Sequence, residues 1–161
     1  MQVFTSYYLF HALIAIVVMF LVLVFVDSVA ETALAAGLGS SVILLFVYPN
    51  SGASAYKNLL GGHIIAIIIG IMCSQLIFGF TSLEQSSVIT GWLVNFIIAL
   101  AIGILILVMV ITKTQHPPAA GSLLGFGLVP FSVMNVVIII SALGILALLK
   151  LCARRIFRDL F

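Results

Sequence analysis

Residues 113–121 (KTQHPPAAG) form a polar island between two apolar runs and hold the side chains best suited to chemistry. Pro118 lacks an N–H, which the first turn of a helix does not need, so it predicts a helix that begins there. The next N–H groups would point back toward His116, and the unpaired donors of a helix N-terminus suit an anion. A tight proline turn without a ligand is the alternative. The residues expected to hold the anion are His116, Pro117, Pro118, Ala119, Gly121 and Ser122.

A second histidine segment reads Gly61-Gly62-His63. Two glycines in the first turn of a helix are unfavourable by roughly 1 kcal/mol each relative to alanine, so they indicate close helix packing or close approach of a ligand. Each of His63 and His116 could donate to an anion, relay a proton, or simply hydrogen-bond its surroundings. Two histidines without Cys, Asp or Glu nearby make a poor metal site, and we expect neither a metal nor another cofactor.

Further polar residues flank the two histidine segments. Ser40 and Ser41, in a run of small residues, are expected to offer hydroxyls to the anion. Lys57 and Lys113 each precede a histidine segment, where they could draw an anion inward or serve as snorkelling anchors. Asn58 is expected to be the N-cap of the next helix. There is no nucleophile–base pair and no acidic dyad, so we expect no catalytic residue and no enzymatic activity.

The composition determines the kind of element that must position these residues. The chain has 161 residues, of which 65% are hydrophobic and 6% charged. Soluble domains average roughly 25% charged residues, so this composition cannot cover a soluble fold. We therefore expect an all-α integral membrane protein with one domain, residues 1–161, embedded in a lipid bilayer. The net charge of +2 gives no indication of nucleic-acid binding.

Six apolar runs are expected to form four long transmembrane helices and two short or broken ones. The runs are residues 9–26, 32–48, 59–80, 88–111, 118–129 and 131–149. The first is long enough to span and has no basic segment before it, so it is expected to be retained rather than cleaved as a signal peptide. The fifth, at about 18–20 Å if helical, is too short for a roughly 30 Å core.

Either four or six of these runs cross the membrane, depending on whether the second and fifth are re-entrant. With six crossings, Lys57, Lys113 and the C-terminal cluster (Lys150, Arg154, Arg155 and Arg158) fall on one side. The positive-inside rule therefore favours six crossings with both termini in the cytoplasm.

The order of long and short runs predicts an internal repeat. A shift of about 81 residues aligns Pro49 with Pro130 and the Ser40-Ser41 pair with Gly121-Ser122. The two halves, residues 1–81 and 82–161, would then form a 3+3 inverted repeat. Inverted repeats with interrupted segments at matching positions indicate a transport site near the bilayer midplane.

The chain resembles the HPP family of integral membrane proteins, which is named for its His-Pro-Pro tripeptide. The resemblance depends on residues 113–121 (KTQHPPAAG), 39–49 (GSSVILLFVYP) and 57–63 (KNLLGGH). It implies a membrane domain usually described with four spans, and some plant and cyanobacterial relatives are regarded as nitrite transporters. Lys57 departs from the arginine expected there, which keeps the charge but loses a bidentate anion clamp.

These patterns and the resemblance together predict a transporter or channel for a small monovalent anion, with nitrite implied by the resemblance. We expect it in a bacterial inner membrane, as a homo-oligomer whose simplest form is a dimer. The alternative is a structural or regulatory membrane subunit that transports nothing. In that case Gly61, Gly62 and the His-Pro-Pro segment are packing devices.

Overall fold

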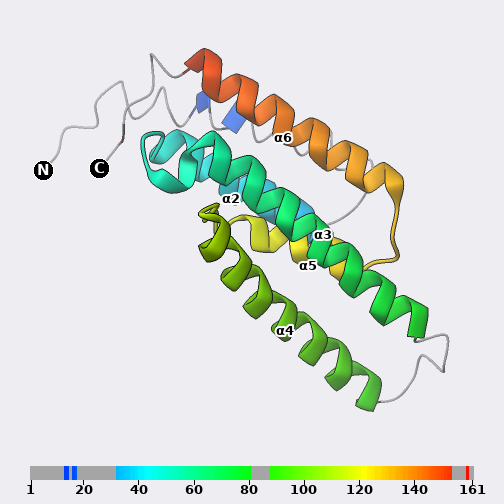
Figure 1. The fold of residues 1–161 in the computed structure, drawn as a ribbon. Helices are drawn as coiled ribbons and strands as arrows, with labels where there is room; N and C mark the ends of the chain where they lie inside the picture. The colour runs from blue at the N-terminus through cyan, green and yellow to red at the C-terminus, as the bar shows by residue number, and fades with distance from the viewer. Residues whose placement is uncertain (1–12, 15, 18–31, 81–87, 154–158, 160–161) are drawn as a thin grey trace, which may run out of the picture.

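The computed structural model describes residues 13–14, 16–17, 32–80, 88–153 and 159 (Figure 1). In this part the chain is all helical, without strands, as the sequence predicts. The helices are α2 (Thr32–Val47), α3 (Tyr56–Phe80), α4 (Val88–Thr112), α5 (Ala119–Gly127) and α6 (Val133–Ala153), with one 3-10 turn, η1 (Gly52–Ser54). Most of the predicted helix 9–26 lies outside the described residues, although residues 13, 14, 16 and 17 are helical.

The described helices differ in length as the apolar runs predict. Three of them, α3, α4 and α6, are long and apolar enough to cross a membrane. Helix α2 has 16 residues, and α5 has only 9. At 1.5 Å per residue they reach about 24 Å and about 14 Å, both less than a roughly 30 Å hydrocarbon core.

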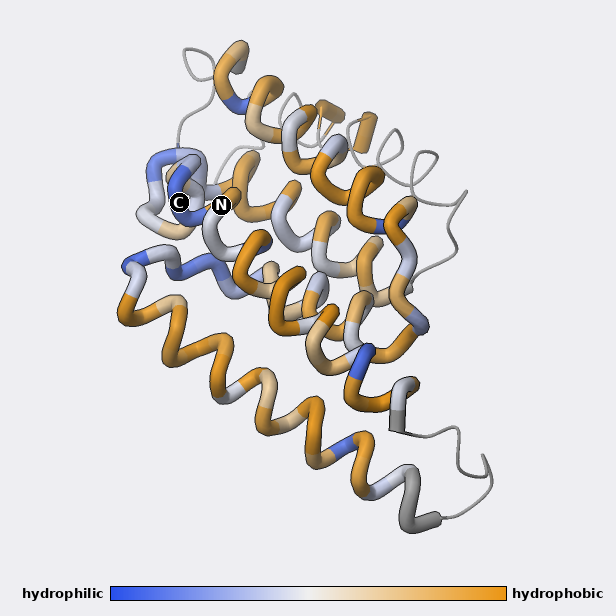
Figure 2. The backbone as a smooth tube through the Cα atoms, turned by 45° about the vertical axis from the view of Figure 1, so that its right-hand side comes forward, coloured by the Kyte–Doolittle hydropathy of each residue, from blue (hydrophilic) through white to orange (hydrophobic). Residues whose placement is uncertain are grey.

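The short helix α5 lies inside the bundle, in contact with α2, α3 and α4 (Figure 1). Most of its residues are buried. Helix α6 packs on α2 and α3 on the other side. Helix α4 is hydrophobic along most of its length (Figure 2), and large side chains such as Trp92 (73% exposed) and Ile111 (78%) point outward. Because those side chains are apolar, this face suits lipid.

Glycines let the backbone of α5 come into direct contact with the backbones of the neighbouring helices α2 and α3. A Cβ atom added to Gly121 would lie 2.5 Å from the Cα atom of Gly37 in α2. On the opposite side, a Cβ added to Gly70 in α3 would lie 2.9 Å from the carbonyl oxygen of Leu123. Small residues at such crossings favour helix association in membranes, where apolar side chains alone provide little driving force.

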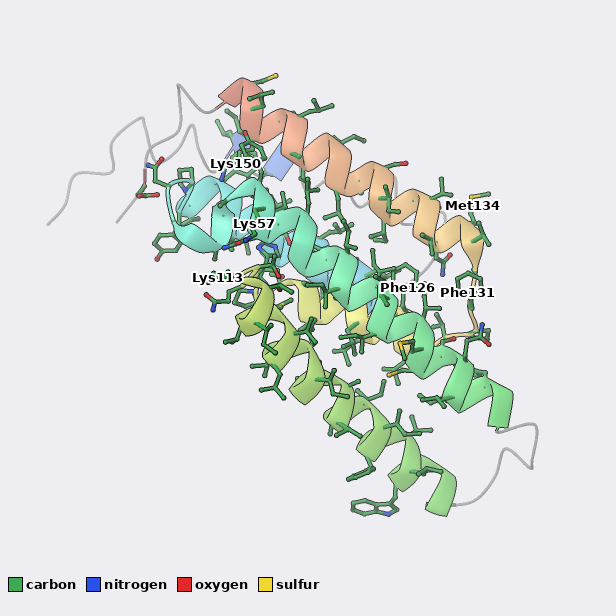
Figure 3. All side chains as sticks on the ribbon, in the orientation of Figure 1. Lys57, Lys113, Phe126, Phe131, Met134 and Lys150 are labelled. Carbon is green, nitrogen blue, oxygen red and sulfur yellow. The ribbon has the colours of Figure 1, made fainter. Side chains whose placement is uncertain are left out.

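The described lysines gather at one end of the bundle, which we call the lysine end. Figure 3 shows Lys57, Lys113 and Lys150 there, and Phe131 and Met134 at the other end. The chain therefore passes from one end to the other between α4 and α6, through α5 and the link that follows it. The six-crossing alternative requires this arrangement, because a re-entrant fifth run would place Lys150 opposite Lys113.

Candidate functional site

The His-Pro-Pro segment begins where α4 ends in a Schellman motif. The N–H of Lys113 donates to the Val110 carbonyl at 3.2 Å, and that of Thr114 donates to the Met109 carbonyl at 3.0 Å. Lys113 has the left-handed conformation that this motif requires, with φ 55°. The motif reverses the chain direction and turns residues 114–118 toward α3.

The two predicted histidine segments lie directly against each other. A Cβ atom on Gly61 would come within 2.7 Å of the Thr114 Cγ2 atom, and a Cβ on Gly62 would lie 2.7 Å from the His116 Cβ atom. The close approach expected at these glycines is therefore confirmed. The group that approaches them is the chain's own His-Pro-Pro turn.

Four buried side chains meet at this contact, and we call them the histidine–serine cluster: Ser41, His63, His116 and Ser122. The two imidazole rings are 5.0 Å apart between centroids. Ser41 Oγ lies 3.0 Å from the Nε2 atoms of both His63 and His116. The Nδ1 atom of His63 lies 2.7 Å from Ser122 Oγ, and that of His116 lies 2.8 Å from the Ala53 carbonyl oxygen. All four side chains are 0% exposed, so the cluster is closed and tightly packed.

The environment of His116 favours its neutral form. Burial lowers the pKa of His116, the hydrogen bond to the Ala53 carbonyl raises this pKa in part, and the positive charge of Lys150 lowers it. The ring is therefore neutral near pH 7.

The amides at the start of α5 are not available to an anion, so the expectation that they are unpaired is wrong. The N–H groups of Ala119, Ala120 and Gly121 donate to the carbonyls of His116, Pro117 and Pro118 at 3.0–3.1 Å. The two prolines begin the helix with tight turns, and these turns place each carbonyl within reach of the amide three residues later.

Other predicted site residues lie outside the cluster. Ser40 is exposed, and its hydroxyl donates to carbonyls of its own helix, those of Ala36 and Gly37. Asn58 is not an N-cap, because α3 begins two residues earlier, at Tyr56. Its Nδ2 atom instead donates to the Gly52 carbonyl at 2.8 Å.

The three lysines of the chain lie at the lysine end of the bundle (Figure 3). Lys57 and Lys113 are exposed. From the sequence, Lys150 is expected only to be part of the basic C-terminal cluster that sets the membrane orientation. In the structure, its Nζ atom donates to the carbonyls of Pro49 and Ser54. Its charge also lies 5.3 Å from the ring centre of Tyr56. The sequence feature that could have pointed to Lys150 is its position as the one basic residue in the last turn of α6.

A cavity of about 90 Å³ opens beside Lys150, and we call it the lysine cavity. Its lining comes from α2, α3, α6 and the segment after α2: Leu45, Phe46, Pro49, Asn50, Tyr56, Leu146 and Lys150. Turn η1 connects this cavity to the cluster, because Lys150 binds the Ser54 carbonyl and His116 binds that of the preceding residue, Ala53. Within the described ranges, no three His, Cys, Asp or Glu side chains could hold a metal ion.

A family model described as "HPP, transmembrane region" matches residues 2–158, which is nearly the whole chain. Searches of curated proteins and of solved structures found no match.

Proposed function

The chain belongs to the HPP transmembrane family, and from this premise we propose that it carries a small monovalent anion across the membrane, with nitrite as the leading substrate. The histidine–serine cluster is the observation that supports this most directly. Two imidazoles and two hydroxyls meet there, fully buried, where the interrupted helix α5 begins. Ionisable side chains inside a membrane domain are costly and are typical of solute pathways.

The lysine end provides the approach for the anion. Exposed Lys57 and Lys113 raise the local anion concentration. The lysine cavity then presents Lys150, whose ammonium group has three donors, two of which are taken by the Pro49 and Ser54 carbonyls. We propose that the remaining donor binds the anion in the cavity, where the Tyr56 ring and the charge of Asp159 also act on the ammonium group.

Within the cluster, the N–H groups of His63 and His116 and the hydroxyls of Ser41 and Ser122 are the donors for the anion. The cluster is closed, so a transport step must open it. Turn η1 is the nearest wall, because its Ala53 carbonyl binds His116 while Ser54 binds Lys150 on the cavity side. Movement of this short turn would join the cavity to the cluster.

The topology belongs to the same proposal. Six crossings arranged as an inverted repeat would make Ser41 and Ser122 equivalent, and these two hydroxyls bind the two nitrogens of the same His63 ring. From the positive-inside rule we propose that the lysine end and both termini lie in the cytoplasm, and a bacterial inner membrane remains the expected location. Homo-oligomer formation remains a prediction.

The test is nitrite influx into liposomes that contain the purified full chain, measured by stopped flow against empty vesicles. We expect influx clearly above the empty-vesicle background, saturable with nitrite concentration. Protein that is monodisperse and helical but gives no influx above background would end this proposal.

A non-transporting structural subunit is the second candidate, and the tight packing favours it. The chain's own atoms fill the space beside Gly61 and Gly62, and every cluster side chain has a partner. This candidate predicts that glutamine at positions 63 and 116 leaves the cellular phenotype unchanged. The transport proposal predicts that the same double variant loses influx, while Ser40→Ala, which changes an exposed hydroxyl one residue from the cluster, keeps it.

A further inference from the structure

The carbonyl of Ala53 is the starting point for assigning donor and acceptor in each hydrogen bond of the histidine–serine cluster. A carbonyl oxygen only accepts, so the Nδ1 atom of His116 must carry a proton and donate to Ala53. In a neutral ring the Nε2 atom then accepts, and the donor within reach is the Ser41 hydroxyl. Ser41 Oγ also lies 2.9 Å from the Gly37 carbonyl of its own helix, so this pairing requires the hydroxyl proton to point to His116 rather than to Gly37. Ser41 has one proton, so it must accept from Nε2–H of His63. The Nδ1 atom of His63 then accepts from the Ser122 hydroxyl.

The same atoms also accommodate one extra proton while every ring nitrogen keeps a hydrogen-bond partner. If the proton is on His63, its two N–H groups donate to Ser122 and Ser41, and the Ser122 hydroxyl proton turns away from the ring. For transfer, Ser41 Oγ takes the Nε2 proton of His63 and gives its own proton to Nε2 of His116. One N–H and one O–H bond break, and one of each forms. His116 then donates to Ser41 and Ala53, and Ser41 donates to His63.

We propose that the histidine–serine cluster is a proton relay in which Ser41 passes a single proton between His63 and His116, and that this proton travels with the transported anion. The relay follows from the hydrogen-bond geometry alone. Its coupling to an anion rests on the proposed function. Ser41 is the only bridge between the rings among the described contacts.

The charges around the rings explain why the proton needs an anion. Helices α2 and α5 contribute only hydroxyls to the rings, and α6 contributes the positive charge of Lys150. Lys57 of α3 and Lys113 after α4 are exposed and positive. Asp159, the one carboxylate in the described part of the chain, accepts from the N–H of Asn50, and its charge acts on Lys150 rather than on the rings.

Among the described residues, a protonated cluster therefore has no carboxylate in contact with its buried positive charge, which is unfavourable inside a bilayer. A monovalent anion beside the protonated ring removes that penalty. Proton and anion then load together, and the loaded cluster is neutral. Transport by this relay is electroneutral and does not respond to membrane potential.

The first experiment measures the tautomers by NMR on the ¹⁵N-histidine-labelled full chain in lipid nanodiscs near pH 7, with His63→Gln and His116→Gln samples for assignment. We expect the proton on Nδ1 of His116 and on Nε2 of His63. The opposite tautomer on either ring would overturn the relay. This measurement uses the unmodified chain, so it decides the relay even where a Ser41 variant does not fold.

The second experiment measures nitrite influx and internal pH together in liposomes, with the signal of empty vesicles subtracted because nitrous acid crosses lipid unaided. We expect about one proton per nitrite, since one monovalent anion balances one proton, and no response to an imposed potential. Ser41→Ala is expected to lower the coupled proton signal by about tenfold or more, because the bridge between the rings is lost. The matched control Ser40→Ala should keep it.

The outcomes separate the two proposals. Nitrite influx that is driven by potential and carries no proton would overturn the relay and leave the proposed function standing. Expected tautomers without any nitrite influx would support the relay and overturn the proposed function.

Discussion

Replacing Gly62 with alanine is expected to push the His-Pro-Pro turn away from α3. The added Cβ atom would lie 2.7 Å from the His116 Cβ atom and 3.1 Å from the Thr114 carbonyl oxygen. Both are parts of a turn that the Schellman motif holds in place, so neither moves without shifting backbone. His116 would then move away from Ser41, and the cluster would lose its short hydrogen bonds.

Two opposing effects determine the change in the free energy of unfolding. Overpacking of this kind costs about 1–3 kcal/mol. Alanine in a helix interior gains about 1 kcal/mol over glycine. Gly144→Ala in α6 is the matched control, because it has the same helix-propensity gain and nothing lies within 4 Å of its added Cβ. We expect Gly62→Ala to be about 1–3 kcal/mol less stable than Gly144→Ala.

The assay is reversible unfolding of both variants in the same detergent, followed by circular dichroism, with nitrite influx measured in parallel. The Gly62 variant should lose both stability and influx, and the Gly144 variant should lose neither. If the two variants unfold alike, then the His-Pro-Pro turn does not lie against Gly62, and the cluster geometry built on that contact is wrong.

Three further predictions use the same unfolding assay. Lys113→Gly should raise the free energy of unfolding by about 1 kcal/mol, since a left-handed non-glycine residue is strained; no increase would mean the Schellman turn is absent. Ser74→Ala should lower it by about 1–2 kcal/mol, because its hydroxyl donates to the Val129 carbonyl after α5, whereas the exposed Ser141→Ala should be near neutral; equal effects would contradict this. The lowered pKa of His116 contributes stability above about pH 6.5, which is lost as the pH falls below that value toward the folded-state pKa, because the unfolded chain then binds more protons. A melting temperature that falls from pH 7.5 to 5 in the wild type, and falls less in His116→Gln, would agree with this prediction. Identical pH profiles of the melting temperature in the two proteins would contradict it.

The helices could be predicted from the sequence because apolar runs bounded by polar residues or prolines leave few alternatives in a membrane. The break at Pro118 and the close approach at Gly61 and Gly62 follow from proline and glycine chemistry. Ser40 and Ser41 could not be distinguished in this way. Helix α2 is apolar around most of its circumference, so hydrophobic periodicity does not reveal which serine points inward.

The structure of the site differs from the prediction where contacts between distant parts of the chain determine the hydrogen-bond partners. The amides of α5 are paired because two prolines form consecutive tight turns, and the local sequence allowed paired or unpaired amides. The role of Lys150 depends on carbonyls about 100 residues earlier in the chain, and no short-range pattern reports such a contact. The Ala53 carbonyl, which determines the hydrogen-bond direction in the cluster, has no sequence signal because every residue has a carbonyl.

Nitrite influx through Ser41→Ala and Ser40→Ala protein, measured side by side in liposomes at equal protein content, tests most directly whether the buried cluster carries the anion. The two variants lose the same hydroxyl at adjacent positions, one inside the cluster and one on the exposed face of α2. We expect influx to fall by about tenfold or more in Ser41→Ala and to stay within about twofold of wild type in Ser40→Ala. Equal influx in two well-folded variants would contradict a transport path through the histidine–serine cluster.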